Sequence, residues 1–183
     1  LVADETQLAT LLEKFGLTAS RPLLGHCPGA EYGPAKQWPA RHFAAAAADA
    51  LAAGWQVAVF GGPKDVAISA EIANLVDEQR GGGLVVNLAG ETTLLEVVDL
   101  LSGCAHVISN DSGLMHIACA VGAAVTVVYG SSSPGFTPPL SERAEIASLS
   151  LACSPCFKRQ CPLGHTNCLN DLTPDRLAVR FER

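Results

Sequence analysis

The sequence predicts an α/β domain built on a Rossmann-like parallel sheet with helices on both faces. Two observations lead to this prediction. Short apolar segments, several of them rich in valine, alternate along the chain with longer segments in which apolar residues recur at helical spacing. Alternation of this kind implies a mostly parallel sheet that is covered on both sides. The 183 residues are enough for one such domain with a sizeable core.

The elements of the first half follow one another in the order helix, strand, helix, strand, helix. A first helix is predicted for Leu8–Leu17 and a buried strand for Leu23–Cys27. Proline is favoured in the first turn of a helix, so a second helix is predicted for Pro39–Ala53. A strand at Gln56–Phe60 and a helix at Lys64–Gln79 complete this half.

The second half continues the alternation. A third strand is predicted for Leu84–Leu88, and Thr93-Leu-Leu-Glu96 forms a capping box that starts the next helix. A fourth strand at Cys104–Ser109 precedes a helix at Leu114–Val121, and a fifth strand follows at Ala124–Tyr129. The domain is expected to occupy residues 1–183, with a cysteine-rich loop segment at 150–172 and a C-terminal helix at 173–183.

Charge and composition exclude two classes of function. The net charge is −6 and only 5% of the residues are aromatic. A nucleic-acid-binding domain shows a basic surface with interleaved aromatic side chains, so we expect no nucleic-acid partner. No segment contains the roughly 18 consecutive apolar residues that a membrane-spanning helix needs.

The seven cysteines fall into two sets. Cys27, Cys104 and Cys119 occur singly and are expected to act as small apolar core residues. The other four gather in the cysteine-rich segment: Cys153, Cys156, Cys161 and Cys168. Four thiols beside His165 could bind zinc or include a redox pair, but their spacing matches no common zinc site. We assign no metal and expect the segment to stabilise a loop, with the other two roles left open.

The segment Ser109-Asn-Asp-Ser-Gly-Leu-Met-His116 follows a predicted strand and opens a helix. Backbone amides point outward at a helix start, at the positive end of the helix dipole, so the segment predicts a phosphate site. Gly113 allows close approach, and Ser112 and His116 lie on the same side of the helix. The alternative is an ordinary helix start, with Asp111 or Ser112 as N-cap and His116 as a core histidine.

Two further loops follow predicted strands, and ligands of parallel sheets lie beyond the carboxyl ends of the strands. In Pro28-Gly-Ala-Glu-Tyr-Gly-Pro-Ala-Lys-Gln-Trp-Pro39, Lys36 can place a positive charge on a diphosphate, or it is a surface lysine on a turn. In Gly61-Gly-Pro-Lys-Asp65, Lys64 and Asp65 could contact a sugar or ribose, although a plain turn fits equally well. Neither a Walker loop nor a Gly-x-Gly-x-x-Gly motif occurs, which argues against an ATPase and a nicotinamide dehydrogenase.

Taken together, these segments resemble glycosyltransferase family 9, and within it the group of ADP-heptose:lipopolysaccharide heptosyltransferases of type II. The resemblance spans about residues 20–175, and its motifs occur in the expected order. The matching segments are Pro28–Pro39, Gly61–Asp65, Asn87-Leu-Ala-Gly90, Ser109–His116 and Cys153–His165. The resemblance implies the GT-B architecture, in which two Rossmann-like domains face each other across a cleft. This chain resembles the C-terminal domain, which binds the nucleotide-sugar donor.

The resemblance also implies a reaction. Such enzymes transfer L-glycero-D-manno-heptose from ADP-heptose to the inner core of lipopolysaccharide, with inversion at the anomeric carbon. The implied acceptor is heptosyl-Kdo-lipid A, and no cofactor is required. Two other functions remain open: a nucleotide-sugar epimerase of GT-B shape, in which Asp111 and His116 would move a proton, and a zinc-stabilised binding module.

The family's site residues carry over to six positions. The resemblance implies that Lys36 contacts the donor diphosphate and that Asp111 forms hydrogen bonds with the heptose hydroxyls. Three residues of the helix start are expected at the diphosphate: Ser112, Gly113 and His116. Lys64 falls where relatives carry an acidic residue near the nucleoside, and it is assigned to the donor site as well.

The chain is expected to be the donor half of a larger protein. It starts at Leu1, and its only methionine is Met115, so we expect an excised domain that lacks the N-terminal acceptor domain and its catalytic base. Alone, it is expected to bind nucleotide weakly and to catalyse nothing. The cysteine usage favours a cytoplasmic location, and a peripheral association with the inner membrane is a further expectation.

Overall fold

The computed structural model describes residues 1–80 and 85–181, and six parallel strands form its sheet in the order β3-β2-β1-β4-β5-β6. On one side of the sheet centre, β1 (Leu23–Cys27) pairs with β2 (Gln56–Val59), with Leu24 opposite Val57. β3 (Val85–Asn87) pairs with β2 and forms the edge. Every residue of β1 and β2 is buried, which agrees with their mostly apolar sequences, and His26 and Gln56 are the polar exceptions.

On the other side, β1 pairs with β4 (His106–Asn110), which is followed by β5 (Val125–Val128) and β6 (Ala144–Ala147). The strand order reverses between β1 and β4, because chain-consecutive strands run outward in both directions from this pair. In doubly wound sheets of this order, ligands lie beyond the carboxyl ends of the strands at the point of reversal. The loops after β1 and β4 are therefore the first places to look for a site.

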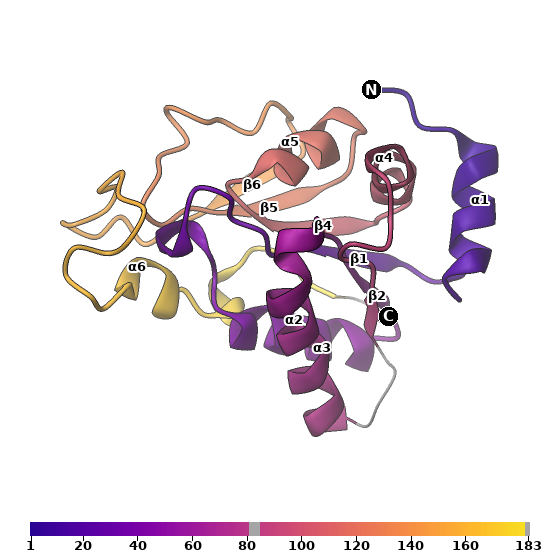
Figure 1. Ribbon diagram of the computed structural model, residues 1–183, viewed down its shortest axis with the longest axis horizontal. Helices are drawn as coiled ribbons and strands as arrows, with labels where there is room; N and C mark the ends of the chain where they lie inside the picture. The colour runs from indigo at the N-terminus through magenta and orange to yellow at the C-terminus, as the bar shows by residue number, and fades with distance from the viewer. Residues whose placement is uncertain (81–84, 182–183) are drawn as a thin grey trace.

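Helices cover both faces of the sheet (Figure 1). One face is covered by α1 (Glu5–Lys14), α4 (Leu94–Ser102) and α5 (Gly113–Ala120), whose apolar residues share a core with Phe60 and Tyr129. The capping box that starts α4 forms as predicted, since Thr93 Oγ1 accepts from the Glu96 amide and Glu96 accepts from the Thr93 amide.

The opposite face is covered by α2 (Ala40–Ala52) and α3 (Val66–Arg80). Ala44, Ala47 and Ala50 of α2 are fully buried, and their small side chains let the helix lie close to the sheet. Short 3-10 helices precede these two helices: η1 (Pro34–Lys36) and η2 (Pro63–Asp65). In the described residues no helix is both long enough and apolar enough to cross a membrane.

The predicted fold class is confirmed, and the five predicted strands agree with the structure to within a few residues. Leu84, the first residue of the predicted third strand, lies outside the described residues. Two elements were not predicted: β6 and the short helix α6 (Asn167–Asn170). Two of the four residues of β6 are exposed, so its sequence lacks the apolar pattern of the buried strands.

The C-terminal helix predicted for residues 173–183 is wrong for the described residues. A single 3-10 turn, η3 (Pro174–Arg176), is followed by extended chain from Leu177. The apolar side chains of Leu177, Val179 and Phe181 alternate and belong to the core beside α2, which suits an extended segment rather than a helix. The predicted helix end at 182–183 lies outside the described residues.

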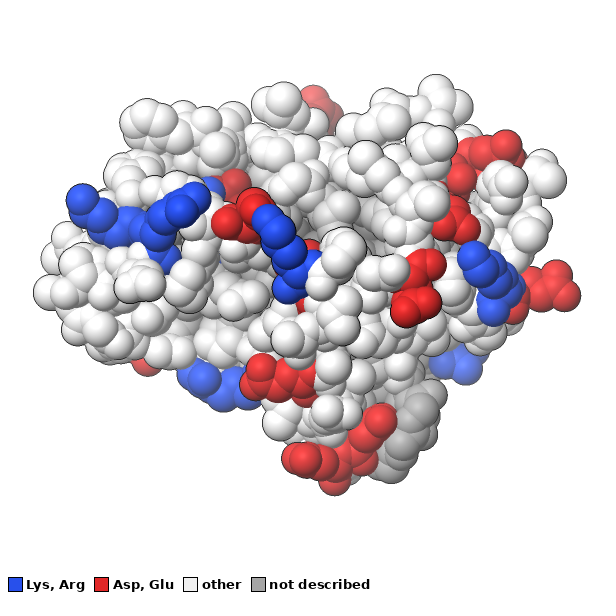
Figure 2. All heavy atoms as spheres, in the orientation of Figure 1, with Lys and Arg blue, Asp and Glu red and all other residues white. Residues whose placement is uncertain are grey.

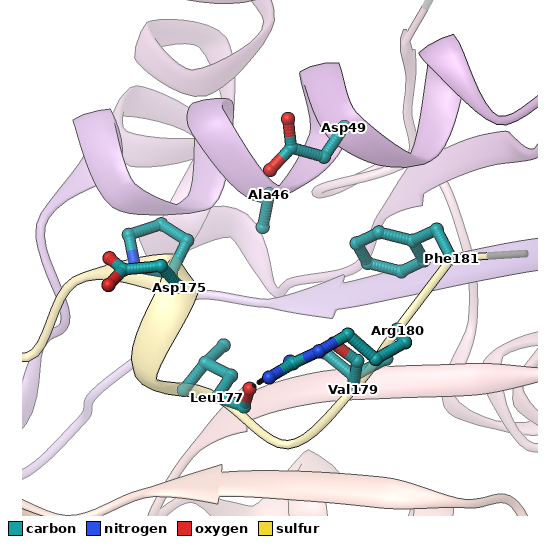
Figure 3. Close-up of a pocket in the computed structure, with 8 residues that line it drawn as sticks. Ala46, Asp49, Asp175, Leu177, Val179, Arg180 and Phe181 are labelled. Atoms are coloured by element: carbon teal, nitrogen blue, oxygen red, sulfur yellow. Dashed lines mark hydrogen bonds between the residues drawn. The ribbon is translucent and has the colours of Figure 1, made fainter.

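This extended segment and α2 enclose a hollow of about 380 Å³ (Figure 3). Ala46 and Asp49 line it from α2, and Leu177 and Phe181 line it from the C-terminal segment. The Arg180 side chain turns back and donates a hydrogen bond to the Leu177 carbonyl (Figure 3). None of the six residues predicted for the donor site lines this hollow.

Candidate functional site

The loop after β1 is fastened to the end of β4 by one buried side chain. Asn110, the last residue of β4, donates from Nδ2 to the Pro28 carbonyl (2.7 Å) and accepts on Oδ1 from the Trp38 amide (3.0 Å). It thus holds both ends of residues 28–38, which we call the Lys36 loop. This fixes the Lys36 loop beside the residue that follows, Asp111.

Lys36 and Asp111, two of the predicted site residues, form an ion pair at this point. Lys36 Nζ lies 2.6 Å from Asp111 Oδ2, and the side chains are 14% and 4% exposed. The Thr137 hydroxyl donates to the same oxygen over 2.9 Å, and the Tyr32 ring lies 5.2 Å from the Lys36 ammonium. Largely buried charges of opposite sign that face a loop edge are typical of a binding site rather than of a solvated surface turn.

The N-terminus of α5 is open. Ser112 is the N-cap residue by its backbone angles, but it makes no capping hydrogen bond through its side chain. A Cβ built on Gly113 would meet nothing within 4 Å, so this position borders free space. His116 is exposed, one turn further along the helix. Of the alternative, the N-cap position of Ser112 is confirmed and the core position of His116 is wrong. Because no side chain caps the helix, its first amides remain available to an anion.

Lys64 lies on the exposed surface next to the Lys36 loop. It pairs with Glu31 of the Lys36 loop over 2.5 Å, and both side chains are more than three-quarters exposed, at 79% and 78%. The hydrogen bond and the charge of Glu31 raise the pKa of Lys64. Its neighbour Asp65 instead accepts from the Gly62 amide (2.9 Å) and lines the pocket beside α5. The assignment of Lys64 to the donor site stays a prediction.

Two pockets flank the Lys36 loop. The first, which we call the α5 pocket, has a volume of about 350 Å³. It is lined by Gly29–Glu31, Asp65, Leu94, Ser112–Leu114 and Ile117. The second, which we call the aromatic pocket, has a volume of about 190 Å³. It is lined by Tyr32, Lys36, Ser131, Ser132, Phe136, Thr137 and Phe157. Ser112 and Gly113 thus face the α5 pocket, and Lys36 faces the aromatic pocket.

The cysteine-rich segment supports the Lys36 loop from outside. The Ala35 amide donates to the Arg159 carbonyl (3.1 Å), and the Tyr32 hydroxyl donates to the Phe157 carbonyl (3.0 Å). Gly33 has a φ of +152°, and a Cβ there would lie 2.6 Å from the Arg159 oxygen, so the close approach requires glycine. These contacts agree with the expected loop-stabilising role.

The four clustered thiols line one small cavity together with His165, and all seven cysteines are free. Burial raises the pKa of Cys168, whereas the Thr166 amide and the neighbouring amides lower the pKa of Cys161. Within residues 1–80 and 85–181, no group of three or more His, Cys, Asp or Glu side chains is arranged to hold a metal ion. Cys27, Cys104 and Cys119 are buried in the core as predicted.

Sequence reasoning missed two residues of the site, Asn110 and Thr137. Asn110 lies inside a motif that was recognised, but its role as a clamp depends on the register of β1 and β4. Thr137 follows the fifth predicted strand, and the rule that ligands lie beyond strand ends pointed to this loop. Its contact with Asp111 spans 26 residues and has no local sequence signature.

Charged side chains of both signs are interspersed on the face of the molecule shown in Figure 2. Figure 2 shows lysine and arginine in separate groups next to aspartate and glutamate on the face in view, with white surface between them. This pattern agrees with the net charge of −6. The positive charge of the site comes from Lys36 and the helix start rather than from a broad basic surface.

Comparison with known proteins gives a consistent set of matches. Residues 1–167 match the family described as glycosyltransferase family 9 (heptosyltransferase). The chain is 46% identical over 153 residues to lipooligosaccharide heptosyltransferase 2 of Haemophilus influenzae, and 41% identical over 178 residues to lipopolysaccharide heptosyltransferase 2 of Escherichia coli. These matches cover 81% and 97% of this chain but 44% and 51% of the relatives. The chain therefore spans about half the length of the curated relatives it matches.

One solved structure is similar along almost the whole chain. The structure of E. coli ADP-heptose lps heptosyltransferase II superposes with a TM-score of 0.84 at 39% sequence identity. The match covers 96% of this chain and 50% of that one. The similarity thus includes the sheet, the Lys36 loop and the start of α5.

Proposed function

Because the chain belongs to glycosyltransferase family 9, we propose that it is the donor-binding half of an inverting heptosyltransferase that uses ADP-heptose. The observation that carries the proposal is the pairing of Lys36 with Asp111 beside the uncapped start of α5. Both features lie at the reversal point of the sheet, where nucleotides bind in doubly wound folds.

The departing nucleoside diphosphate is the group that this half must stabilise. When the bond between the anomeric carbon and the phosphate oxygen breaks, negative charge grows on the phosphate. The amides at the start of α5 and the Lys36 ammonium can receive that charge without rearranging. Each such donor is typically worth about 10²–10³ in rate. We infer that this arrangement serves the step and that no metal ion is required for it.

We assign the sugar of the donor to Asp111 and its nucleoside to the α5 pocket. Ser112, Gly113 and exposed His116 are assigned to the diphosphate, and the α5 pocket, which Ser112 and Gly113 line, has room for a nucleoside. Asp111 is an acceptor for sugar hydroxyls, because a carboxylate keeps further lone pairs when one of its oxygens is already bonded. Lys64 is assigned to the nucleoside end of the donor, on the resemblance alone.

The remaining steps are proposed to belong to the half of the relatives outside the matched region. An acceptor hydroxyl must lose a proton as it attacks, and the base and the binding surface for heptosyl-Kdo-lipid A are expected there. A cytoplasmic protein, associated peripherally with the inner membrane where that acceptor is made, is the setting that this reaction implies.

Nucleotide titration tests the proposal directly. We expect isothermal titration of the chain to show binding of ADP in preference to UDP and GDP. Lys36→Ala should weaken ADP binding by about tenfold or more, because a charge-assisted hydrogen bond is lost. The matched control is Lys14→Ala, which removes an ion pair with Glu96 on the surface between α1 and α4 and should leave the affinity unchanged. A preference for UDP would contradict the heptose assignment while leaving the fold intact.

A turnover assay tests the division into halves. The chain, given ADP-heptose and heptosyl-Kdo-lipid A, is expected to release no ADP and to form no product. Measurable turnover would show that the acceptor base lies within these residues. The epimerase and the zinc-stabilised module are not favoured, because the relatives compared above are heptosyltransferases. An epimerised sugar nucleotide in the same assay would favour the epimerase instead.

A further inference from the structure

We propose that Thr137 is a positioning residue that keeps one oxygen of Asp111 free for the sugar hydroxyls of the donor. The inference rests on the proposed function and extends it to a loop that no motif marked. It follows from the way in which hydrogen bonds are distributed over the two carboxylate oxygens of Asp111.

Both donors to Asp111 converge on the same oxygen. Lys36 Nζ lies 2.6 Å from Oδ2, and the Thr137 hydroxyl lies 2.9 Å from it. From the described residues, Oδ1 receives no hydrogen bond, and it is not among the buried polar atoms that lack a partner, so solvent reaches it. A carboxylate oxygen accepts two hydrogen bonds readily, so Oδ2 is saturated and Oδ1 is left to a ligand.

Thr137 is itself held in place by the strand behind it. Tyr129, which directly follows β5 and is 1% exposed, donates from its hydroxyl to the Thr137 carbonyl over 2.5 Å. The Thr137 amide donates to the Ser133 carbonyl (3.2 Å). The Thr137 hydroxyl also lies 3.4 Å from that carbonyl, but its contact with Asp111 is shorter. The position of the hydroxyl is thus fixed by the sheet and not by the ligand.

A single donor cannot fix a carboxylate in this way. The terminal torsion of aspartate is broad and twofold, so Lys36 alone would leave the group free to turn about its bond to Cβ. Two donors from different directions remove this freedom before a ligand arrives, and preorganisation of this kind raises affinity for the group that uses the free oxygen. Loss of the Thr137 hydroxyl should therefore lower the affinity for the sugar. It should leave the affinity for the diphosphate unchanged, because we assign the contacts of the diphosphate to the start of α5.

The test compares two ligands in three variants. We would measure the dissociation constants of ADP and ADP-heptose for the chain by titration calorimetry. The ratio of the two constants reports the contribution of the heptose to binding. In Thr137→Val, which keeps the shape and loses the hydroxyl, the ratio should shift about fivefold to tenfold against ADP-heptose. Thr137→Ser should restore the ratio of the unchanged chain. Thr126→Val is the matched control, because it removes a buried threonine hydroxyl that bonds His106 in β4 and should leave the ratio unchanged.

The outcomes separate the inference from the proposed function. An unchanged ratio in Thr137→Val, or an equal loss for both ligands, would overturn the positioning role while donor binding stands. Failure of the unchanged chain to bind either ligand would contradict the proposed function and remove the premise of the inference. Failure of Thr137→Ser to restore the ratio would show that the methyl packing, and not the hydroxyl, matters.

Discussion

Single residues at the start of α5 combine the two properties that an anion site needs, unsatisfied donors and empty space. The Ser112 side chain leaves the first amides of the helix uncapped, and Gly113 leaves the space in front of them unfilled. The same two positions line the α5 pocket. Substitutions here should therefore separate binding from stability.

Gly113→Ala is expected to abolish most nucleotide binding without weakening the fold. Its φ does not lie in the region that favours glycine, and a methyl group would meet no protein atom within 4 Å, so the free energy of unfolding should not fall. The methyl group would occupy the space that the diphosphate needs, and ADP binding should weaken by about tenfold or more. Titration calorimetry and urea unfolding of the same preparation check both halves of this expectation.

Gly54→Ala provides the opposite control. This position also borders open space, but its φ of +88° strains any residue with a Cβ. The free energy of unfolding should fall by about 1 kcal/mol, and ADP binding should be unchanged. If Gly113→Ala lowered stability and Gly54→Ala lowered affinity, the location of the site at α5 would be contradicted.

The sequence could predict those site residues whose chemistry is written into local motifs. Asp111, Ser112 and Gly113 occur on a strand-to-helix turn, and Lys36 occurs in a glycine- and proline-rich loop. Asn110 and Thr137 could not be assigned, because their roles depend on partners 82 and 26 residues away. Such contacts are fixed by strand order and register, which local patterns do not determine.

Among the elements, the cysteine-rich segment agrees with its expected role of stabilising a loop. Its thiols line one cavity, and its backbone carbonyls accept hydrogen bonds from the Lys36 loop. β6 was missed, and the C-terminal extended chain was wrongly predicted as a helix. Each packs through two or three apolar residues only, which is too few to distinguish helical from extended periodicity.

The thiols of this segment should differ in reactivity. The amides of Thr166 and of Leu163–His165 lower the pKa of Cys161, while burial raises the pKa of Cys168. At pH 7.5 the fraction of thiolate should therefore be larger at Cys161, and iodoacetamide should modify it before Cys168 and before buried Cys119. Mass spectrometry of peptides from a time course would give the order.

Two variants make the reactivity experiment specific. Cys161→Ser should remove the fastest alkylation phase, and Cys168→Ser should retain it. Modification of Cys168 ahead of Cys161 would show that the amides do not stabilise the Cys161 thiolate.

At the scale of the whole molecule, stability is expected to depend on buried histidines. Burial, with a smaller contribution from His106, lowers the pKa of His26 to about 3, and burial lowers the pKa of His106 to about 4. Neither nitrogen of His26 has a hydrogen-bond partner among the described residues. Below pH 6.5 the unfolded chain binds protons that the folded chain rejects, so acid favours unfolding.

The stability conferred by these histidines is fully present above pH 6.5 and is lost as the pH falls towards 4 and 3. The free energy of unfolding should drop by about 1.4 kcal/mol per pH unit for each histidine in this window. Urea unfolding at pH 7.5, 6.0 and 5.0 would measure the slope. His26→Leu should reduce the slope of the free energy of unfolding against pH below pH 6.5. Between pH 7.5 and 8.5 the variant and the unchanged chain should have the same slope. Equal slopes at all pH values would contradict the role of His26.

One contact that supports the Lys36 loop can form only late in the synthesis of this domain. The Trp38 indole nitrogen donates to the Leu172 carbonyl, 134 residues further along the chain. At translation rates of roughly 5–20 residues per second, that partner appears on the order of ten seconds later. All six strands have been synthesised before then, whereas the Lys36 loop still lacks its last hydrogen bond. The Lys36 loop thus lacks this hydrogen bond until residue 172 has been synthesised.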